Sequence, residues 1–200
     1  KRPMQEESPP DSTSRDPISE VFHLYDPPLW LVTAADGDRR GGLIATLAAR
    51  ASIVPDLPRM VVGIAKHHHT WALIEASGAF ALHLLRMDDL EAVWRFGLAS
   101  GHHTDKLAGL PQRHTPEGSP LYPHAHAWLD CRVEGRMDTG DRTLYLAEIK
   151  GGAVLARGPV LGVGTLLGSA PPERLAELNR LYRVDQVLDR DAIQAWRTVR

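Results

Sequence analysis

The residues best suited to binding chemistry form a polar turn, Lys66-His67-His68-His69-Thr70, directly after an apolar run. A lysine and a threonine that bracket the start of a helix can hold a phosphate, because the free N–H groups and the dipole there already favour an anion. A solvated turn fits the same residues, and the sequence leaves both readings open. His67 and His69 could also chelate a metal, but a polar turn that lines a pocket is the commoner use of such residues. We therefore expect no metal site.

A second stretch, residues 41–55, is apolar and built mostly of small residues, with Thr46 and Ser52 as polar members. Gly and Ala leave the backbone uncovered, so a flat ligand can lie against it and bond to main-chain N–H and C=O groups. An aromatic ring system with a hydrogen-bonding edge would suit this surface. The alternative is a buried strand packed closely on a neighbour, and these residues alone favour that alternative.

Composition and missing motifs exclude several other classes of protein. The 200 residues carry a net charge of −2 with both signs interspersed, so there is no basic field for nucleic acid or an anionic membrane. Phosphate-loop, dinucleotide, GxSxG and HExxH signatures are absent. Cys131 is the only cysteine, and no apolar run approaches the roughly 18 residues of a membrane span. We expect a cytoplasmic protein without nucleic-acid or membrane partners.

Short apolar runs between turn signals predict the sheet that positions these residues. Residues 29–34 and 41–54 flank the Asp36-Gly37 turn as a hairpin, and residues 59–65 form a third strand. Thr70 is expected to cap a helix that ends at Gly78, and Asp88 to cap a second helix. Further strands are predicted at residues 79–85, 125–136, 143–149 and 153–156. The strand at 125–136 is expected to have one solvent-exposed face, which includes Asp130. Together they predict an all-β barrel.

The remaining segments complete the expected organisation. Residues 1–20 are polar and contain prolines, which predicts a disordered or extended arm before a barrel domain at residues 21–157. Residues 158–200 are expected to be a helical extension packed on that domain. The glycine cluster at 162–168 is interpreted as strand and turn, and Asp189 as the cap of a last short helix. Residues 100–122 form a long loop, and such loops are commonly functional or mobile.

Three blocks of sequence then carry a family resemblance. They read GLIATLAARASIVPDLPRMVVGIAKHHHTWALIEASGAFALHLL, WRFGLASGHHTDKLAGL and HAWLDCRVEGRMDTGDRTLYLAEI, and they lie between about residues 28 and 151. Together they resemble the flavin reductase-like family with the FMN-binding split-barrel fold. The resemblance implies an antiparallel Greek-key split β-barrel with a few peripheral helices, an FMN cofactor, and a homodimer with the flavin near its interface.

The resemblance also implies which residues contact the cofactor. The segment matching residues 43–47 would run along the flavin ring, while residues 51–52 and the turn after the third strand would lie by the ribityl phosphate. A pair in the long loop would close near the cofactor. The implied cofactor-binding residues are Leu43, Ile44, Ala45, Thr46, Leu47, Ala51, Ser52, Lys66, His67, Thr70, Asp105 and Lys106. No catalytic side chain is implied, because the cofactor carries the redox chemistry.

The implied activity is that of an FMN oxidoreductase. FMN would take a hydride from NADH or NADPH and pass electrons to free flavin, oxygen or a partner monooxygenase. Many flavin reductases carry a histidine after the Gly-Asp of the penultimate hairpin, whereas Arg142 follows Gly140-Asp141 here. This difference favours an alternative, a flavin-binding carrier or sensor without nicotinamide turnover. A metal-dependent hydrolase that uses the histidine-rich turns is the least favoured reading.

Overall fold

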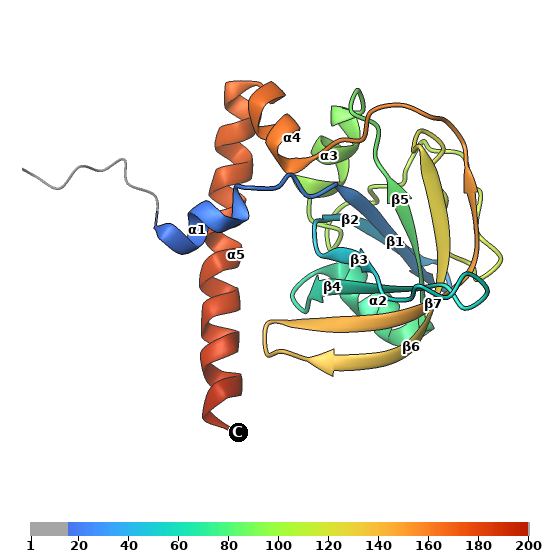
Figure 1. Ribbon diagram of the computed structural model, residues 1–200, viewed down its shortest axis with the longest axis horizontal. Coiled ribbons are helices and arrows are strands. Elements are labelled where there is room, and N and C mark those ends of the chain that lie inside the picture. The colour runs from blue at the N-terminus through green and yellow to red at the C-terminus, as the bar shows by residue number, and fades with distance from the viewer. Residues whose placement is uncertain (1–15, 200) are drawn as a thin grey trace, which may run out of the picture.

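The computed structural model describes residues 16–199, and one curled antiparallel sheet lies at its centre (Figure 1). The seven strands follow the order β2-β1-β5-β6-β7-β4-β3, so β2 and β3 are the two edges. The strands are β1 Trp30–Asp36, β2 Arg39–Ala45, β3 Ala48–Arg50, β4 Arg59–Ala65, β5 Ala79–Leu84, β6 Ala127–Asp138 and β7 Arg142–Val154. The sheet curls into a half-barrel, which confirms the predicted all-β split-barrel fold.

The split between β2 and β3 lies where one longer strand was predicted. β1 and β2 pair across the Gly37 turn as expected, but β2 ends at Ala45 rather than continuing to residue 54. The chain then crosses to pair β3 with β4, and the Gly63 N–H donates to the Leu47 carbonyl at 2.9 Å. A Cβ on Gly63 would overlap the Leu47 side chain, so the glycine makes room for this crossing.

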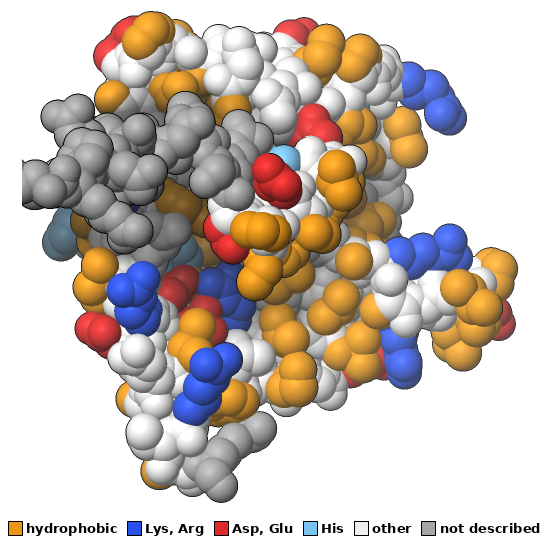
Figure 2. Space-filling view, turned by 60° about the vertical axis from the view of Figure 1, so that its left-hand side comes forward, with side chains coloured by type: hydrophobic (Ala, Val, Ile, Leu, Met, Phe, Trp, Pro, Cys, Tyr) orange, Lys and Arg blue, Asp and Glu red, His pale blue; other side chains and the backbone are white. Residues whose placement is uncertain are grey.

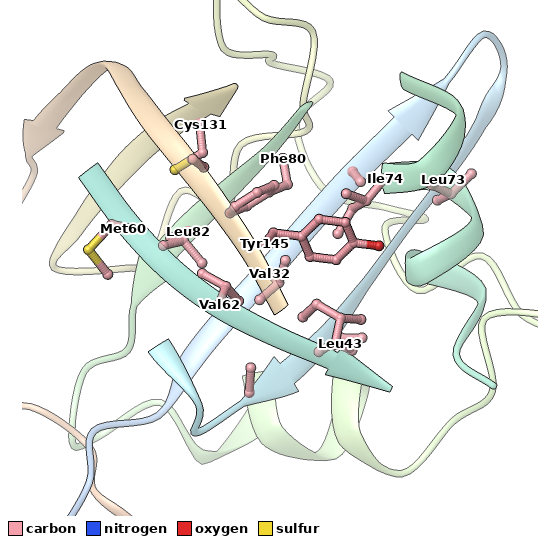
Figure 3. Packing of buried hydrophobic residues seen from close by; sticks show 14 residues of the cluster. Val32, Leu43, Met60, Val62, Leu73, Ile74, Phe80, Leu82, Cys131 and Tyr145 are labelled. Atoms are coloured by element: carbon pink, nitrogen blue, oxygen red, sulfur yellow. The ribbon is translucent and has the colours of Figure 1, made fainter. Parts of the chain in front are cut away.

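The main hydrophobic core fills the inside of the curl (Figure 3). Val32, Val62, Phe80, Leu82 and Tyr145 meet there from four different strands, all fully buried. A second apolar cluster, around Leu31, Phe96 and Leu161, packs between the sheet and α3. Burial of these side chains supplies most of the driving force for folding and holds the edges of the sheet in place.

The first residues of the helices α2 and α3 differ from those predicted. α2 His69–Ser77 has His68 at its N-cap, while Thr70 lies inside the first turn and is buried. α3 Leu90–Gly97 is capped by Asp89 rather than Asp88, because the Asp89 carboxylate accepts the Ala92 N–H at 3.2 Å. Gly78 ends α2 with a φ of 67°, as predicted for a C-cap glycine.

The terminal segments are more helical than the sequence predicts. α1 Pro17–Phe22 occupies part of the expected arm; residues 1–15 of that arm lie outside the described residues. In the glycine cluster at 162–168, Gly162 makes a single β-bridge to Pro28, whereas the rest forms most of α4 Val163–Ser169 rather than strand and turn. The Gly164 N–H donates to Asp26 at 2.7 Å. α5 Pro172–Thr198 is one helix that passes through Asp189, because no glycine or proline interrupts residues 173–198.

Two strand details also correct the expectation. Asp130 is buried rather than wet, since a bulge between Asp130 and Cys131 breaks the alternation of faces. Its carboxylate accepts the Glu117 N–H at 3.0 Å. β7 is one strand rather than two. Among residues 16–199, no helix is both long and apolar enough to cross a membrane.

Candidate functional site

A cavity of about 150 Å³ opens where β4 gives way to α2, and we call it the histidine-turn pocket. Segments from β2, the turn after β4, the end of α3, the long loop and α5 meet around it. It is lined by Gly42, Leu43, His67, His68, His69, Thr70, residues 97–102, Lys106 and Leu181. Of the sequence-predicted cofactor residues, the pocket thus brings together Leu43, His67, Thr70 and Lys106.

The start of α2 gives the pocket its capacity to bind an anion. Within the described chain no side chain caps this helix, and the Trp71 N–H donates to the His68 carbonyl at 3.0 Å. Free N–H groups and the helix dipole favour a negative charge at this end. The helix N-terminus predicted at this turn is therefore present, with its N-cap at His68, two residues before Thr70.

Two of the histidines that line the pocket, His68 and His69, are held neutral. Burial lowers the pKa of His68 to about 4, and the neighbouring His67, Lys106 and Arg142 lower it further. Burial also lowers the pKa of His69, with His102 adding to the effect; their rings meet edge-on at 5.2 Å. His68 and His69 at pH 7 can therefore donate or accept a hydrogen bond, but they supply little positive charge.

Lys106 brings a buried ammonium group to the pocket. Its Nζ donates to the carbonyl oxygens of Phe96 at 2.7 Å and Gly42 at 3.1 Å. Burial lowers its pKa to about 8, which leaves the group mostly protonated at pH 7. An ammonium has three N–H donors, so one remains for a ligand. Lys106 thus ties the end of α3 to the outer edge of β2 and can still contact an anion.

Two predicted residues point away from the pocket lining. The Lys66 ammonium lies 2.7 Å from an Asp138 carboxylate oxygen, toward the β6-β7 hairpin. Asp105 accepts a 2.7 Å hydrogen bond from Arg40, and this bond is the main reason that its pKa is lowered. Both side chains therefore already have partners outside the pocket.

The other predicted residues lie along or beyond the split. Leu43 and Ala45 turn their side chains into the main core, and Ile44 packs on the second cluster. Thr46 and Leu47 are exposed at the crossing. Ala51 and Ser52 follow Arg50, which pairs with Met60. Lys66 lies six residues past Met60, or about 20 Å along an extended strand. Within a single copy of the protein, Ala51 and Ser52 therefore lie away from the histidine turn.

The small residues of this region have two different roles. A Cβ on Gly41 would come within 3.0 Å of the His69 ring, and one on Gly42 within 3.0 Å of the Phe96 ring, so these glycines allow close packing. Ala48 and Ala49 instead line an apolar hollow of about 370 Å³ at the far end of β4, together with Trp30 and Met60. The Trp30 indole N–H is buried there without a partner among the described residues.

Sequence reasoning missed the part of the pocket formed by residues 97–102 and Leu181. The long loop was marked as functional by its length, but nothing local placed its glycine and histidines against the turn. Leu181 belongs to the predicted helical extension, and nothing in the local sequence places it at the pocket. In the structure α5 brings Asp185 to within 3.2 Å of His67, and Asp189 to within 2.8 Å of Arg142.

Comparison with known proteins assigns the chain to a family. Residues 22–161 match the flavin reductase like domain. The chain belongs to the flavin reductase-like family. It is 31% identical over 119 residues to the reductase subunit HsaB of a flavin-dependent monooxygenase from Rhodococcus jostii, covering 60% of this chain and 58% of that protein. It is 29% identical over 142 residues to the high molecular weight rubredoxin of Moorella thermoacetica, covering 70% of this chain and 61% of that protein.

Solved structures support the fold of this flavin reductase-like chain. The NADH:FAD oxidoreductase SgcE6 of Streptomyces globisporus superposes with a TM-score of 0.62 at 22% identity, over 77% of this chain and 92% of that chain. A nitrilotriacetate monooxygenase component B homologue from Mycobacterium thermoresistibile gives 0.62 at 24% identity, over 73% and 84%. The chain spans only 61% of the Moorella protein and 24% of a diflavin flavoprotein from Nostoc, so it matches part of those relatives.

Proposed function

We propose that this flavin reductase-like protein binds FMN and uses NADH or NADPH to reduce it, passing electrons to free flavin, oxygen or a partner monooxygenase. The observation that carries the proposal is the convergence of distant residues on one pocket. Gly42 and Leu43, the turn from His67 to Thr70, and Lys106 are far apart in sequence and line the same cavity. One relative is named as the reductase subunit of a monooxygenase and one structural neighbour as a monooxygenase component, and both names support the choice of electron acceptor.

The pocket fits the phosphate end of FMN better than its ring. A volume of about 150 Å³ is below the roughly 300 Å³ at which sites for drug-sized ligands begin. Its donors are the start of α2, the Thr70 hydroxyl and the third Lys106 N–H, a set suited to a phosphate. The ring would then lie outside the cavity, along the free edge of β2 toward Thr46 and Leu47, where main-chain groups are available.

The protein residues would bind and orient, while FMN supplies hydride acceptance and onward electron transfer when bound. Lys106 would place one positive charge beside the phosphate, and its bonds to Gly42 and Phe96 keep that charge in position. The proposal gives no side chain an acid or base role.

A fluorescence titration with FMN and riboflavin tests the proposal. FMN should bind more tightly than riboflavin, and Thr70→Val should weaken FMN about tenfold, because a hydrogen bond to a charged group is worth about 1.5–3 kcal/mol. Riboflavin affinity should stay unchanged, since it has no phosphate. Thr104→Val, in the exposed loop, is the matched control. Equal affinity of the wild type for FMN and riboflavin would refute the phosphate assignment.

The second candidate function is a flavin carrier or sensor, and the Arg142 environment favours it. The Arg142 guanidinium bonds to the carboxylates of Asp141 and Asp189, so an anionic nicotinamide donor would have to displace a carboxylate to use it. A steady-state assay of NADH and NADPH oxidation with added FMN separates the two functions. Turnover supports the reductase, whereas FMN binding without oxidation of either donor supports the carrier.

A further inference from the structure

We propose that His67, His68 and Asp185 form a binding site for a divalent cation of the zinc class, which joins helix α5 to the turn after β4. The site goes beyond the proposed flavin chemistry. It also revises the sequence expectation of no metal, because Asp185 lies more than a hundred residues from the histidines and no local spacing could reveal the set.

The ligand atoms are already gathered. One nitrogen from each histidine and one Asp185 oxygen lie within 4.8 Å of one another. The His67 Nε2 to Asp185 Oδ1 distance is 3.2 Å. Two ligands on a tetrahedral ion with bonds of about 2.0–2.1 Å stand roughly 3.3 Å apart, so this pair already has the spacing of one tetrahedral edge. The His68 nitrogen lies within 4.8 Å of both atoms and would complete the set by rotating toward the ion.

The contact between His67 and Asp185 is not an ordinary hydrogen bond. The His67 Nε2 atom is buried and has no hydrogen-bond partner among the described residues, although the Asp185 oxygen is only 3.2 Å away. The two groups are close but not aligned with each other. A buried polar atom without a partner destabilises the fold, and a shared cation would satisfy both groups.

A supporting carboxylate stands behind His67. The other ring nitrogen, Nδ1, lies 3.6 Å from Asp189 Oδ1, and Asp189 is itself held by Arg142 at 2.8 Å. Histidine ligands of metals commonly direct their second ring nitrogen toward a carboxylate, which fixes the tautomer and the ring orientation. Two imidazoles and one carboxylate suit zinc or a similar borderline cation rather than Mg²⁺ or Ca²⁺, which prefer oxygen ligands.

Titration calorimetry with Zn²⁺ on the untagged, metal-stripped full chain tests the site without flavin or nicotinamide. The wild type should bind one Zn²⁺ saturably, and Asp185→Asn should weaken that binding at least tenfold. Asp185 is partly exposed on α5, so this variant should fold. Asp191→Asn, an exposed aspartate on the same helix, should bind like the wild type. His68→Gln tests the second histidine in the same way.

A thermal melt gives an independent readout, because a ligand bound only to the folded state raises the melting temperature. Zn²⁺ should raise it in the wild type and in Asp191→Asn but not in Asp185→Asn. The proposal is overturned if the wild type shows no saturable Zn²⁺ binding, or if Asp185→Asn binds Zn²⁺ as tightly as the wild type. The flavin proposal is unaffected by either result, since its titration uses no metal.

Discussion

At the scale of single residues, His83 shows how burial fixes a protonation state. It lies fully buried in β5, where Nδ1 is 3.2 Å from the Leu31 carbonyl and Nε2 accepts the Tyr122 N–H at 3.1 Å. A carbonyl only accepts, so the proton must sit on Nδ1. Burial lowers the pKa of His83 to about 4 and outweighs the hydrogen bond to Leu31. The neutral ring therefore links β5, β1 and the long loop.

This pKa predicts a loss of stability in mild acid. The unfolded chain protonates near the ordinary pKa of 6.5 and the folded chain only near 4, so the stabilising contribution is present above pH 6.5 and declines between 6.5 and 4. Denaturant unfolding should show about 2 kcal/mol lost by this group between pH 7.5 and pH 5. The His83→Gln variant keeps an acceptor for the Tyr122 N–H. Its free energy of unfolding should fall by about that much less between pH 7.5 and pH 5. An identical decline in His83→Gln would contradict the assignment; exposed His103→Gln should behave like the wild type.

At the scale of elements, Lys106 joins parts of the fold that no strand pairing connects. β2 is an edge strand, and its Gly42 carbonyl accepts from the Lys106 ammonium, which also holds the Phe96 carbonyl near the end of α3. The side chain is only 8% exposed, so the two carbonyls rely on it rather than on bulk water. The same residue thus closes the sheet edge and faces the histidine-turn pocket.

Lys106→Met should therefore lower the free energy of unfolding by about 1–3 kcal/mol, because two buried carbonyls lose a donor while the apolar stem keeps most of its volume. Chemical denaturation at pH 7 measures this effect. Lys150→Met on β7, where the lysine is largely exposed and pairs with Glu148, should change stability by less than about 0.5 kcal/mol. A Lys106→Met variant as stable as the wild type would contradict this prediction, because it would mean that water donates to the two carbonyls in place of the ammonium.

At the scale of the whole molecule, α5 stands beside the barrel and turns one face toward it (Figure 1). Leu178 packs on the second apolar cluster, and Arg174 lies over the Trp94 ring at 5.8 Å. Tyr182, Val187 and Leu188 on the same helix are exposed. Hydrophobic side chains gather on the molecular face shown in Figure 2. Exposed apolar surface of this kind marks an interaction site.

We predict that the protein is a homodimer and that α5 contributes to the interface. Light scattering at micromolar concentration should give twice the 22.0 kDa chain mass. Val187→Asp should shift the species toward the monomer, because a charge would be buried at the interface. Arg190→Glu, a charge reversal at another exposed position on α5, is the control. A monomeric wild type would contradict the predicted homodimer. A fully dimeric Val187→Asp variant would show that α5 is not part of the interface.

Local sequence patterns determined most of the strands and the family. A short apolar run between turn signals identified β4 over Arg59–Ala65, and a glycine after a helical run identified the C-cap at Gly78, since both signals depend on neighbours in the chain. Tertiary structure decided how these elements meet. Strand order makes β2 and β3 the edges and separates Ser52 from the histidine turn, and a bulge buries Asp130. A continuous α5 carries Asp185 and Asp189 to His67 and Arg142. Such contacts depend on packing between distant segments, so the hydrophobic periodicity within one segment cannot predict them.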